Sequence, residues 1–275
     1  MQDVISGNAA AVDIGRTVFL RHEPGNRMKV ILTAVILTAV LSSAVFSFEP
    51  IGSFSVVDSI PHDTTSETRG LDFFENRLYE STSTPGGPAL MAIDPVTGDT
   101  LIIKWLEERL RPQGVTAVGD KLIQMTFKEI LGFVYDRYSF FPVDTFFLPI
   151  VEGVGITFDG QRLILSDGTS KLVYVDTASY EETGQIQITD DGKAVHYISE
   201  IEYFDNLLLA AVIPSMKIAV IEPQSGEVLQ WLDLSLICRP PERSFIFGLA
   251  WDESTRTLLV TGPRWPWIYR VRLTE

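Results

Sequence analysis

The chain has 275 residues, of which 45% are hydrophobic and 21% are charged, and its formal net charge at pH 7 is −14. This composition is typical of a globular protein with a sizeable core, and the negative charge argues against a nucleic-acid partner, whose phosphates need clustered cations. The single cysteine, Cys238, excludes an intrachain disulfide, and the three histidines show no spacing typical of a zinc site.

The N-terminal part differs in character from the rest. Residues Val30 to Phe48 carry no charge, follow Met28 and Lys29, and end in small residues. If translation starts at Met28, this segment is a cleavable signal peptide. If the preceding residues are genuine, it is long enough to form an N-terminal membrane anchor. Both interpretations place residues 53–275 outside the cytoplasm, in a secreted, periplasmic or membrane-anchored protein, with residues 1–47 as a separate segment.

Alternating residues from Ser53 to Ile60 predict a strand before the first repeat. Such a strand can pair with the last blade of a ring-shaped β-protein, so that no sheet edge stays open. Turn-forming residues at Asp94–Gly98 and Glu222–Gly226 indicate the ends of further strand pairs. Leu101–Leu110 is compatible with a helical turn or with a distorted outer strand.

A pair of short strands recurs along the chain at intervals of roughly 40 to 50 residues, the repeat length of a propeller blade. In each pair a small turn residue or an acid opens the first strand, and the second strand begins with leucine after a polar hairpin. The openings are Gly70, Gly114, Gly155, Ile201 with Glu202, and Gly248, and the second strands begin at Leu78, Leu122, Leu163, Leu207 and Leu258. The chain is therefore predicted to be all-β, with a five-bladed propeller over residues 53–275.

Several short runs near these openings follow a characteristic order. They are Thr68–Leu71, Leu78–Thr82, Gln124–Glu129, Glu152–Gly155, Ser166–Thr169, Glu200–Tyr203 and Thr261–Pro266. In this order they resemble the plant and bacterial type of glutaminyl-peptide cyclotransferase, from about Ser53 to the C-terminus. The resemblance implies a five-bladed propeller that converts the N-terminal glutamine of a peptide to pyroglutamate and releases ammonia, without a catalytic metal or other cofactor. The implied partner is a peptide or protein N-terminus, and we expect a monomer.

Such a reaction needs a group that moves protons, because the α-amine loses a proton and the departing ammonia gains one. Four acids lie near the strand openings and are candidates: Glu80, Glu152, Glu200 and Glu202. Glu200 and Glu202 are two residues apart on a predicted strand and should point the same way. We assign proton transfer to Glu152, Glu200 or Glu202. Alternatively, some of these acids cap turns or bind a structural cation.

The chain departs from the family pattern at several openings. Gln113 stands where the resemblance implies a glutamate that shuttles protons, and an amide cannot act as a general base. Arg69 replaces a glutamine. Other expected aromatic, amide or cationic residues are replaced by Phe127, Val154, Ser199, Ala211, Ile213, Phe247 and Pro263. These changes predict cyclase activity much weaker than is typical of the family.

The remaining candidates are assigned to substrate binding. Arg69 adds a planar cation suited to carboxylates, unless it forms an ion pair with Glu80 or Glu152. Trp265, in the run Arg264–Pro266, is expected to form one wall of the pocket. The complete predicted binding set is Arg69, Glu80, Thr126, Phe127 and Trp265, beside the predicted catalytic set Glu152, Glu200, Glu202 and Gln113.

Three functions fit the sequence. The first is a glutaminyl cyclase with an altered site, and the second is a non-catalytic propeller that binds a peptide or protein through the same end. The third is a metal-dependent hydrolase or lactonase, against which the scarcity of Asn and His at the openings counts. The family resemblance favours the enzyme, and the changed pocket residues favour the binding protein.

Overall fold

The computed structural model describes residues 53–236 and 245–274. The predicted export segment and Cys238 lie outside these residues, so their interpretation stays a prediction. Within the described residues, no helix is both long and apolar enough to cross a membrane.

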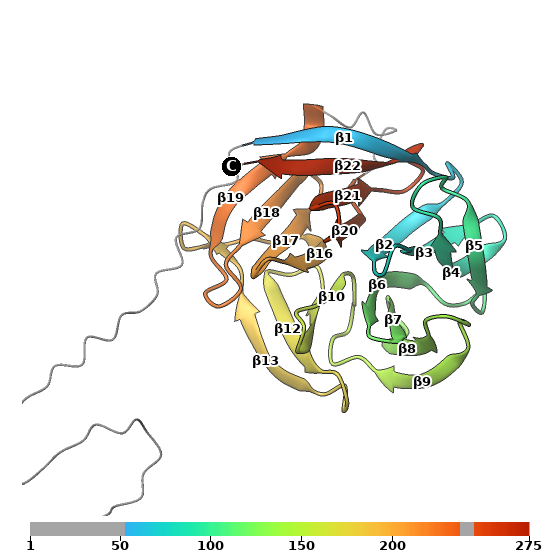
Figure 1. Cartoon of the computed structure of the whole chain (residues 1–275). Coiled ribbons are helices and arrows are strands. Elements are labelled where there is room, and N and C mark those ends of the chain that lie inside the picture. Colours follow the sequence, from blue (N-terminus) through green and yellow to red (C-terminus); the bar gives the residue numbers. More distant parts are fainter. Residues whose placement is uncertain (1–52, 237–244, 275) are drawn as a thin grey trace, which may run out of the picture. The chain divides into compact units, whose positions relative to one another are not determined.

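Five four-stranded antiparallel sheets surround a common centre, as the propeller prediction required (Figure 1). Blade 1 contains β2 (Glu67–Phe73), β3 (Leu78–Thr84), β4 (Gly87–Ile93) and β5 (Thr100–Trp105), and blade 2 contains β6 (Pro112–Val118), β7 (Lys121–Thr126), β8 (Leu131–Asp136) and β9 (Pro142–Phe147). Blade 3 contains β10 (Ile156–Phe158), β11 (Arg162–Ser166), β12 (Lys171–Asp176) and β13 (Glu182–Gln187). Blade 4 contains β16 (Ile198–Phe204), β17 (Leu207–Val212), β18 (Lys217–Ile221) and β19 (Val228–Asp233), and blade 5 contains β20 (Gly248–Asp252), β21 (Thr257–Thr261), β22 (Trp267–Thr274) and β1 (Ser53–Pro61).

The N-terminal strand closes the ring, as predicted. β1 is the outer strand of blade 5 and runs antiparallel to β22, from the pair Ser53 and Thr274 to the pair Pro61 and Trp267. Strands from the two ends of the described chain therefore share one sheet. This pairing joins the first and last blades, so that the ring has no open end between them.

Burial decreases from the inner to the outer strand of a blade. The inner strands β2, β6, β10, β16 and β20 lie nearest the centre in Figure 1 and are mostly buried. The outer strand β5 alternates between exposed and half-buried residues, because one of its faces meets solvent. It covers Thr100–Trp105, so the helical alternative for this region is wrong and the outer-strand alternative is confirmed.

Apolar side chains fill the spaces between neighbouring blades. In one such cluster Leu209 and Ile218 of blade 4 pack with Leu249 and Val260 of blade 5. Between blades 2 and 3, the ring of Phe146 stacks on Tyr180 with centroids 3.9 Å apart. This packing accounts for the apolar character of the strands on both of their faces.

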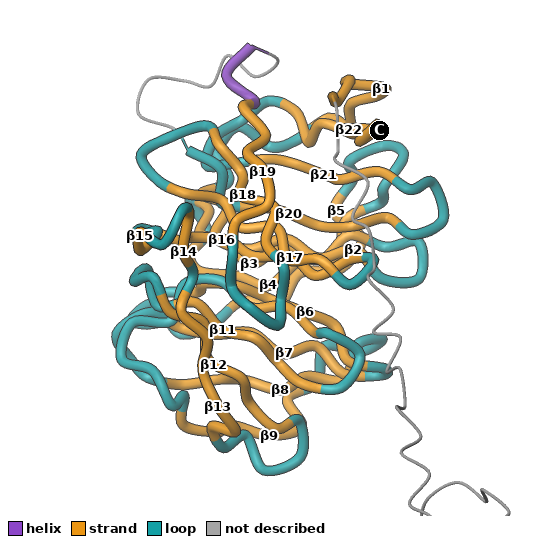
Figure 2. Tube along the Cα trace, turned by 90° about the vertical axis from the view of Figure 1, so that its left-hand side faces the viewer, coloured by secondary structure: helices purple, strands orange, loops and turns teal. Residues whose placement is uncertain are grey.

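Short elements connect some of the blades. A small hairpin of β14 (Thr189–Asp190) and β15 (Lys193–Ala194) lies between blades 3 and 4, at the left of Figure 2. The single-turn 3-10 helix η1 (Leu234–Leu236) follows β19. Both belong to connections that run from an outer strand to the next inner strand.

Candidate functional site

The predicted site residues lie at the end of the propeller where the inner strands begin, which we call the entrance. Here the regular pairing of three inner strands is interrupted, between Thr68 and Gly70, between Pro112 and Val115, and between Ile198 and Ile201. Such bulges turn side chains away from the alternating pattern of a strand. They bring Arg69, Gln113 and Ser199, which the sequence singles out, to the same end of the fold.

The inner strands approach each other very closely at the entrance. A Cβ atom on Gly70 would lie 2.6 Å from the Cα atom of Gly114, and one on Gly155 would lie 2.5 Å from the carbonyl oxygen of Ser199. No side chain fits at these positions without displacing backbone. The equivalent residues of the five blades form what we call the entrance ring: Gly70, Gly114, Gly155, Glu200 and Gly248.

The entrance ring shows that the fourth repeat begins one residue earlier than the sequence predicted. Ile201 pairs with Ala210 just as Leu71 pairs with Glu80 and Ile156 with Leu165, so Glu200 takes the position of the glycines. The expected opening at Ile201 with Glu202 was therefore displaced by one residue. The correction places one carboxyl group in a ring that otherwise consists of glycines.

Glu200 is almost completely buried, with 1% of its surface exposed. Its Oε1 atom accepts a hydrogen bond from the Ile201 amide at 3.3 Å, and no described residue hydrogen-bonds its Oε2 atom. Burial raises the pKa of this carboxyl well above its ordinary value, and the charges of Glu202 and Asp72 raise it further. The neutral acid is favoured, so Glu200 can donate a proton.

Glu202 and Asp72 lie deeper, two residues beyond the ring in their blades, and each bonds to the next blade. Oε1 of Glu202 accepts a hydrogen bond from the Trp251 amide at 2.9 Å, and Oδ2 of Asp72 accepts one from the Ala117 amide at 2.6 Å. Burial raises the pKa of Asp72 to about 6, and burial together with the charge of Asp72 raises that of Glu202. These two carboxyl groups link blades to one another.

A cavity of about 350 Å³ opens at the end opposite the entrance. Asp72 and Glu202 contribute to its lining, together with aromatic residues such as Phe158 and Trp251, whereas Glu200 does not. The two acids, which we expected to point the same way, therefore lie in different surroundings. Glu200 belongs to the entrance and Glu202 faces the opposite cavity, although their charges still interact.

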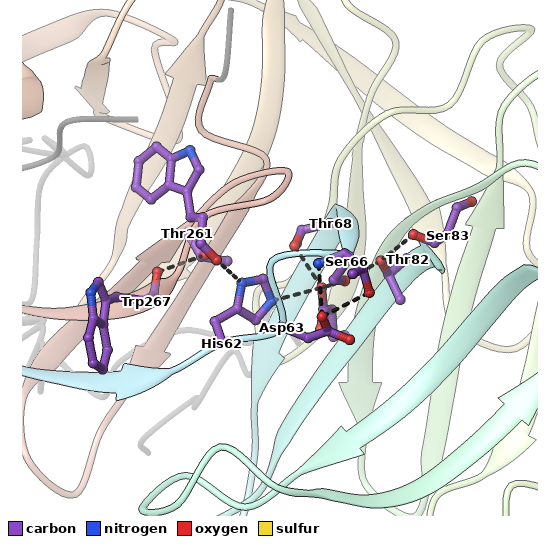
Figure 3. A network of polar contacts seen from close by, with 11 residues as sticks. His62, Asp63, Ser66, Thr68, Thr82, Ser83, Thr261 and Trp267 are labelled. Atoms are coloured by element: carbon purple, nitrogen blue, oxygen red, sulfur yellow. Dashed lines mark hydrogen bonds and ion pairs between the residues drawn. The ribbon is translucent and has the colours of Figure 1, made fainter. Parts of the chain in front are cut away.

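A buried polar network joins blade 5 to blade 1 (Figure 3). His62 donates from Nδ1 to the carbonyl oxygen of Trp265 at 2.7 Å, and its Nε2 lies 3.2 Å from Oε1 of Glu80. The hydroxyl groups of Ser66 and Thr68 donate to the same Glu80 oxygen, both at 2.6 Å. The predicted substrate-binding residue Glu80 is 1% exposed and engaged by these internal donors.

The charges of this network stabilise each other. Burial alone would lower the pKa of His62 and raise that of Glu80. Their mutual attraction and hydrogen bonds outweigh burial, so that the pKa of His62 is raised and that of Glu80 is lowered. The Trp265 carbonyl oxygen and the Glu80 carboxylate can both accept a hydrogen bond from the imidazole only when both ring nitrogens carry hydrogens. The geometry thus describes a buried imidazolium–carboxylate pair, which the sequence analysis did not anticipate for His62. The available indication was its position two residues after the predicted closing strand.

Two further predicted binding residues are buried. Thr126 is fully buried, and its hydroxyl group donates to the Leu131 carbonyl at 2.8 Å and accepts from the Leu131 amide at 3.1 Å. Trp265 is 1% exposed and packs in the apolar cluster between blades 4 and 5. Thr126 therefore holds the β7–β8 turn, and Trp265 packs in the core while its carbonyl holds His62.

Three other predicted residues remain accessible at the entrance end. Phe127 is half-buried with the Lys128 ammonium 5.3 Å from its ring centroid, and Lys128 also lies 3.9 Å from Glu152. The side chain of Glu152 is half exposed. Gln113 is half-buried. These placements are compatible with contact to a ligand, and the assigned roles stay predictions.

Arg69 has a different partner from those expected. Its guanidinium lies 3.9 Å from Glu67 and 5.1 Å from the ring centroid of Phe247. The predicted ion pair with Glu80 or Glu152 is wrong, because Glu80 is engaged by His62 and Glu152 lies beside Lys128. Arg69 therefore stays at the rim of the entrance, between blades 5 and 1.

Glu129 is a further buried acid at the entrance end that the sequence analysis did not single out. Its side chain is 13% exposed, its Oε1 atom lies 3.2 Å from Nε of Arg111, and its buried Oε2 atom has no hydrogen-bond partner among the described residues. Its position in the run Gln124–Glu129 was the only available indication. Across the described parts of the chain, no three His, Cys, Asp or Glu side chains are arranged to hold a metal ion.

Comparison with known proteins shows to which family the chain belongs. The family model described as glutamine cyclotransferase matches residues 29–273. The chain belongs to the glutamine cyclotransferase family. It is 33% identical to the glutaminyl-peptide cyclotransferase of Arabidopsis thaliana over 232 residues, which cover 82% of this chain and 72% of the plant protein.

The same fold occurs in a solved structure. The crystal structure of Myxococcus xanthus glutaminyl cyclase superposes with a TM-score of 0.73 at 24% sequence identity, over 81% of this chain and 97% of that one. This likeness confirms the β-propeller fold of the chain.

Proposed function

We propose that the protein is a glutaminyl-peptide cyclotransferase, which cyclises the N-terminal glutamine of a peptide. The observation that carries this proposal is the 33% identity to the Arabidopsis glutaminyl-peptide cyclotransferase over 82% of the chain. The entrance supports it, because Glu200 is a group able to move a proton and its Oε2 atom has no hydrogen-bond partner among the described residues.

The reaction needs no water and no redox partner. The α-amine nitrogen attacks the side-chain amide carbon, a carbon–nitrogen bond forms, and the original bond to the amide nitrogen breaks as ammonia leaves. One proton moves from the attacking to the departing nitrogen. We assign this transfer to Glu200, because its raised pKa brings the carboxyl closer to working pH, where a group both donates and accepts protons efficiently. We assign substrate binding by hydrogen bonds to the amide of Gln113, which is half-buried and can both donate and accept.

Ammonia release from a peptide with N-terminal glutamine tests the proposal. Pyroglutamate formation should lower the peptide mass by the mass of ammonia, faster than in a buffer control. An alternative function, peptide binding without turnover, is favoured by the near-complete burial of Glu200. Tight binding of the peptide with no rate above the control would establish that alternative and overturn the enzyme.

We predict that Gln113→Glu raises kcat at least tenfold. The variant adds a carboxylate at the entrance, and a well-placed general acid or base contributes a factor of roughly 10² to 10⁴. Single-turnover ammonia release from native protein and variant measures the effect. Gln113→Asn is the matched control, since it keeps the amide and should show no gain. Equal rates for native protein and Gln113→Glu would exclude this position from proton transfer.

We further propose that the protein is exported and works as a monomer outside the cytoplasm. The apolar stretch from Val30 to Phe48 supports export, and the ring closed by β1 within one chain supports a monomer. We expect mass spectrometry of the extracytoplasmic fraction to detect peptides from the propeller and none from residues 1–27. Peptides from that upstream segment in the mature protein would contradict a start at Met28.

A further inference from the structure

Arg69 is a partly buried cation without a firm partner in the described structure. Its side chain is 35% exposed, and the contacts of its guanidinium with described residues are an ion pair with Glu67 and a ring contact with Phe247. Its ion-pair contact with Glu67, at 3.9 Å, is longer than a hydrogen bond. A guanidinium has five N–H donors in a planar fork, so most of its bonding capacity is available to a ligand.

Glu67, the acid that contacts Arg69 among the described residues, also contacts another arginine. Glu67 forms a close ion pair with Arg264, whose side chain is 67% exposed. One carboxylate therefore serves two guanidinium groups, and it binds the outer one more tightly. Among the described residues, the charge of Arg69 is therefore only partly compensated, in a chain whose net charge is −14.

The position of this charge is set by the entrance ring. The bulge in β2 places Arg69 immediately before Gly70, whose backbone is in contact range of Gly114. The guanidinium lies 5.1 Å from the ring centroid of Phe247, which itself precedes Gly248. The cation is therefore held at the rim, adjoining two members of the ring that contains Glu200.

Partial burial makes this guanidinium a good receptor for an anion. Burial lowers the pKa of Arg69 because the charged form loses hydration, while Glu67 acts in the opposite direction. Arginine nevertheless stays protonated in proteins. A carboxylate that reaches it makes bidentate, charge-assisted hydrogen bonds at little further desolvation cost to the arginine.

We propose that Arg69 binds a carboxylate of the peptide just beyond the N-terminal glutamine, so that the protein prefers acidic peptides. This inference rests on the proposed function, in which the glutamine occupies the entrance beside Glu200. A residue spans about 3.3 to 3.6 Å of extended chain, so a carboxylate one or two residues after the glutamine stays near the rim. It comes from an Asp or Glu side chain or from the C-terminus of a very short peptide.

Matched peptides distinguish the two sources of the carboxylate, an Asp or Glu side chain and the peptide C-terminus. Gln-Glu-Ala-amide is compared with Gln-Gln-Ala-amide for the side-chain carboxylate, and Gln-Ala with Gln-Ala-amide for the terminal one. Calorimetry measures Kd, and ammonia release measures kcat and KM. We expect the carboxylate form of at least one pair to bind about tenfold more tightly, with the gain in KM rather than kcat and smaller at high salt.

Variants test whether the preference for a carboxylate depends on Arg69. Arg69→Gln should abolish it, and Arg69→Lys should retain part of it through the charge alone. Glu67→Gln should strengthen it, because the competing carboxylate is removed. Lys128→Gln is the control for a more exposed cation at the same end and should leave the preference unchanged. Thermal unfolding confirms that each variant is folded.

The outcomes distinguish this inference from the proposed function. Equal Kd values within both peptide pairs, or a preference that persists in Arg69→Gln, would overturn the role of Arg69. Absence of ammonia release from every peptide would overturn the cyclase activity, while the Kd values would still decide whether Arg69 binds a carboxylate.

Discussion

Glu200→Gln should lower kcat by a factor of roughly 10² to 10⁴, the usual contribution of a group that transfers protons. The amide has nearly the same size as the carboxyl group but cannot exchange a proton at working pH. Stability should not fall, because the change removes a buried acid that is disfavoured by burial and by Glu202 and Asp72. Steady-state ammonia release and chemical denaturation measure the two quantities on the same preparation.

Two matched variants make this test specific. Glu202→Gln changes a carboxyl that bonds to the Trp251 amide and lines the opposite cavity, and it should have little effect on kcat. Glu152→Gln changes a half-exposed acid beside Lys128 and should likewise be mild. Full activity in Glu200→Gln, with loss in either of the other two, would move proton transfer to that residue.

The dependence of stability on pH provides a second readout for Glu200. Its pKa in the folded state is raised above the ordinary value of 4.5. The stability that this group contributes is therefore complete below pH 4.5 and is lost as the pH rises through the folded-state value. The free energy of unfolding of Glu200→Gln should decline less than that of the native protein between pH 5 and pH 9.

His62→Ala should reduce the free energy of unfolding by about 3 to 5 kcal/mol, the cost of removing one partner from a buried ion pair. The variant leaves the Glu80 carboxylate buried with only hydroxyl donors, and it removes the hydrogen bond from His62 to the carbonyl oxygen of Trp265. Because the network joins the closing blade to blade 1, its loss weakens the ring where the chain ends meet. Denaturant unfolding at pH 6 measures the change.

The pH range of this effect follows from the pKa shifts. The pKa of Glu80 is lowered from 4.5, so its contribution is present above that value and is lost as the pH falls through the folded-state pKa. The pKa of His62 is raised from 6.5, so its contribution is complete below that value and is lost as the pH rises through the folded-state pKa. The difference between native protein and variant should be largest between pH 4.5 and 6.5.

An exposed ion pair serves as the control for His62→Ala. Arg256 pairs with Asp205 on the surface, where solvent screens the interaction, so Arg256→Ala should cause no comparable loss. An equally small change in His62→Ala would show that the network does not secure the ring.

Much of the fold could be predicted because its main determinants are local. Each blade repeats a hairpin with apolar strands and polar turns, and the spacing of those hairpins predicts the number of blades. The pairing of residues 53–60 with the last blade followed from the need to protect sheet edges. The repeat was misplaced by one residue only in blade 4, where Glu200 replaces the glycine that marks the other openings.

The candidate site could be predicted only in part. Family motifs selected residues near the entrance, but motif position does not determine which side chains are buried. Thr126 and Trp265 lie in such motifs and are occupied in a turn and in the core. The partner of Arg69 was missed because Glu67, Glu80 and Glu152 are equally acidic in sequence, and only distance distinguishes them.

The sequence by itself determined the five repeated strand pairs, the closing strand and the family, since each is encoded in short patterns along the chain. Only the tertiary structure decided the burial and the partners of the acids. The inner strands converge so closely that a side chain at Gly70, Gly114 or Gly155 would meet backbone atoms. The same end of the fold buries Glu200, whose Oε2 atom has no hydrogen-bond partner among the described residues, while Glu80 meets His62. The state of a carboxyl group depends on its burial and its neighbours, and residues far apart in the chain supply both.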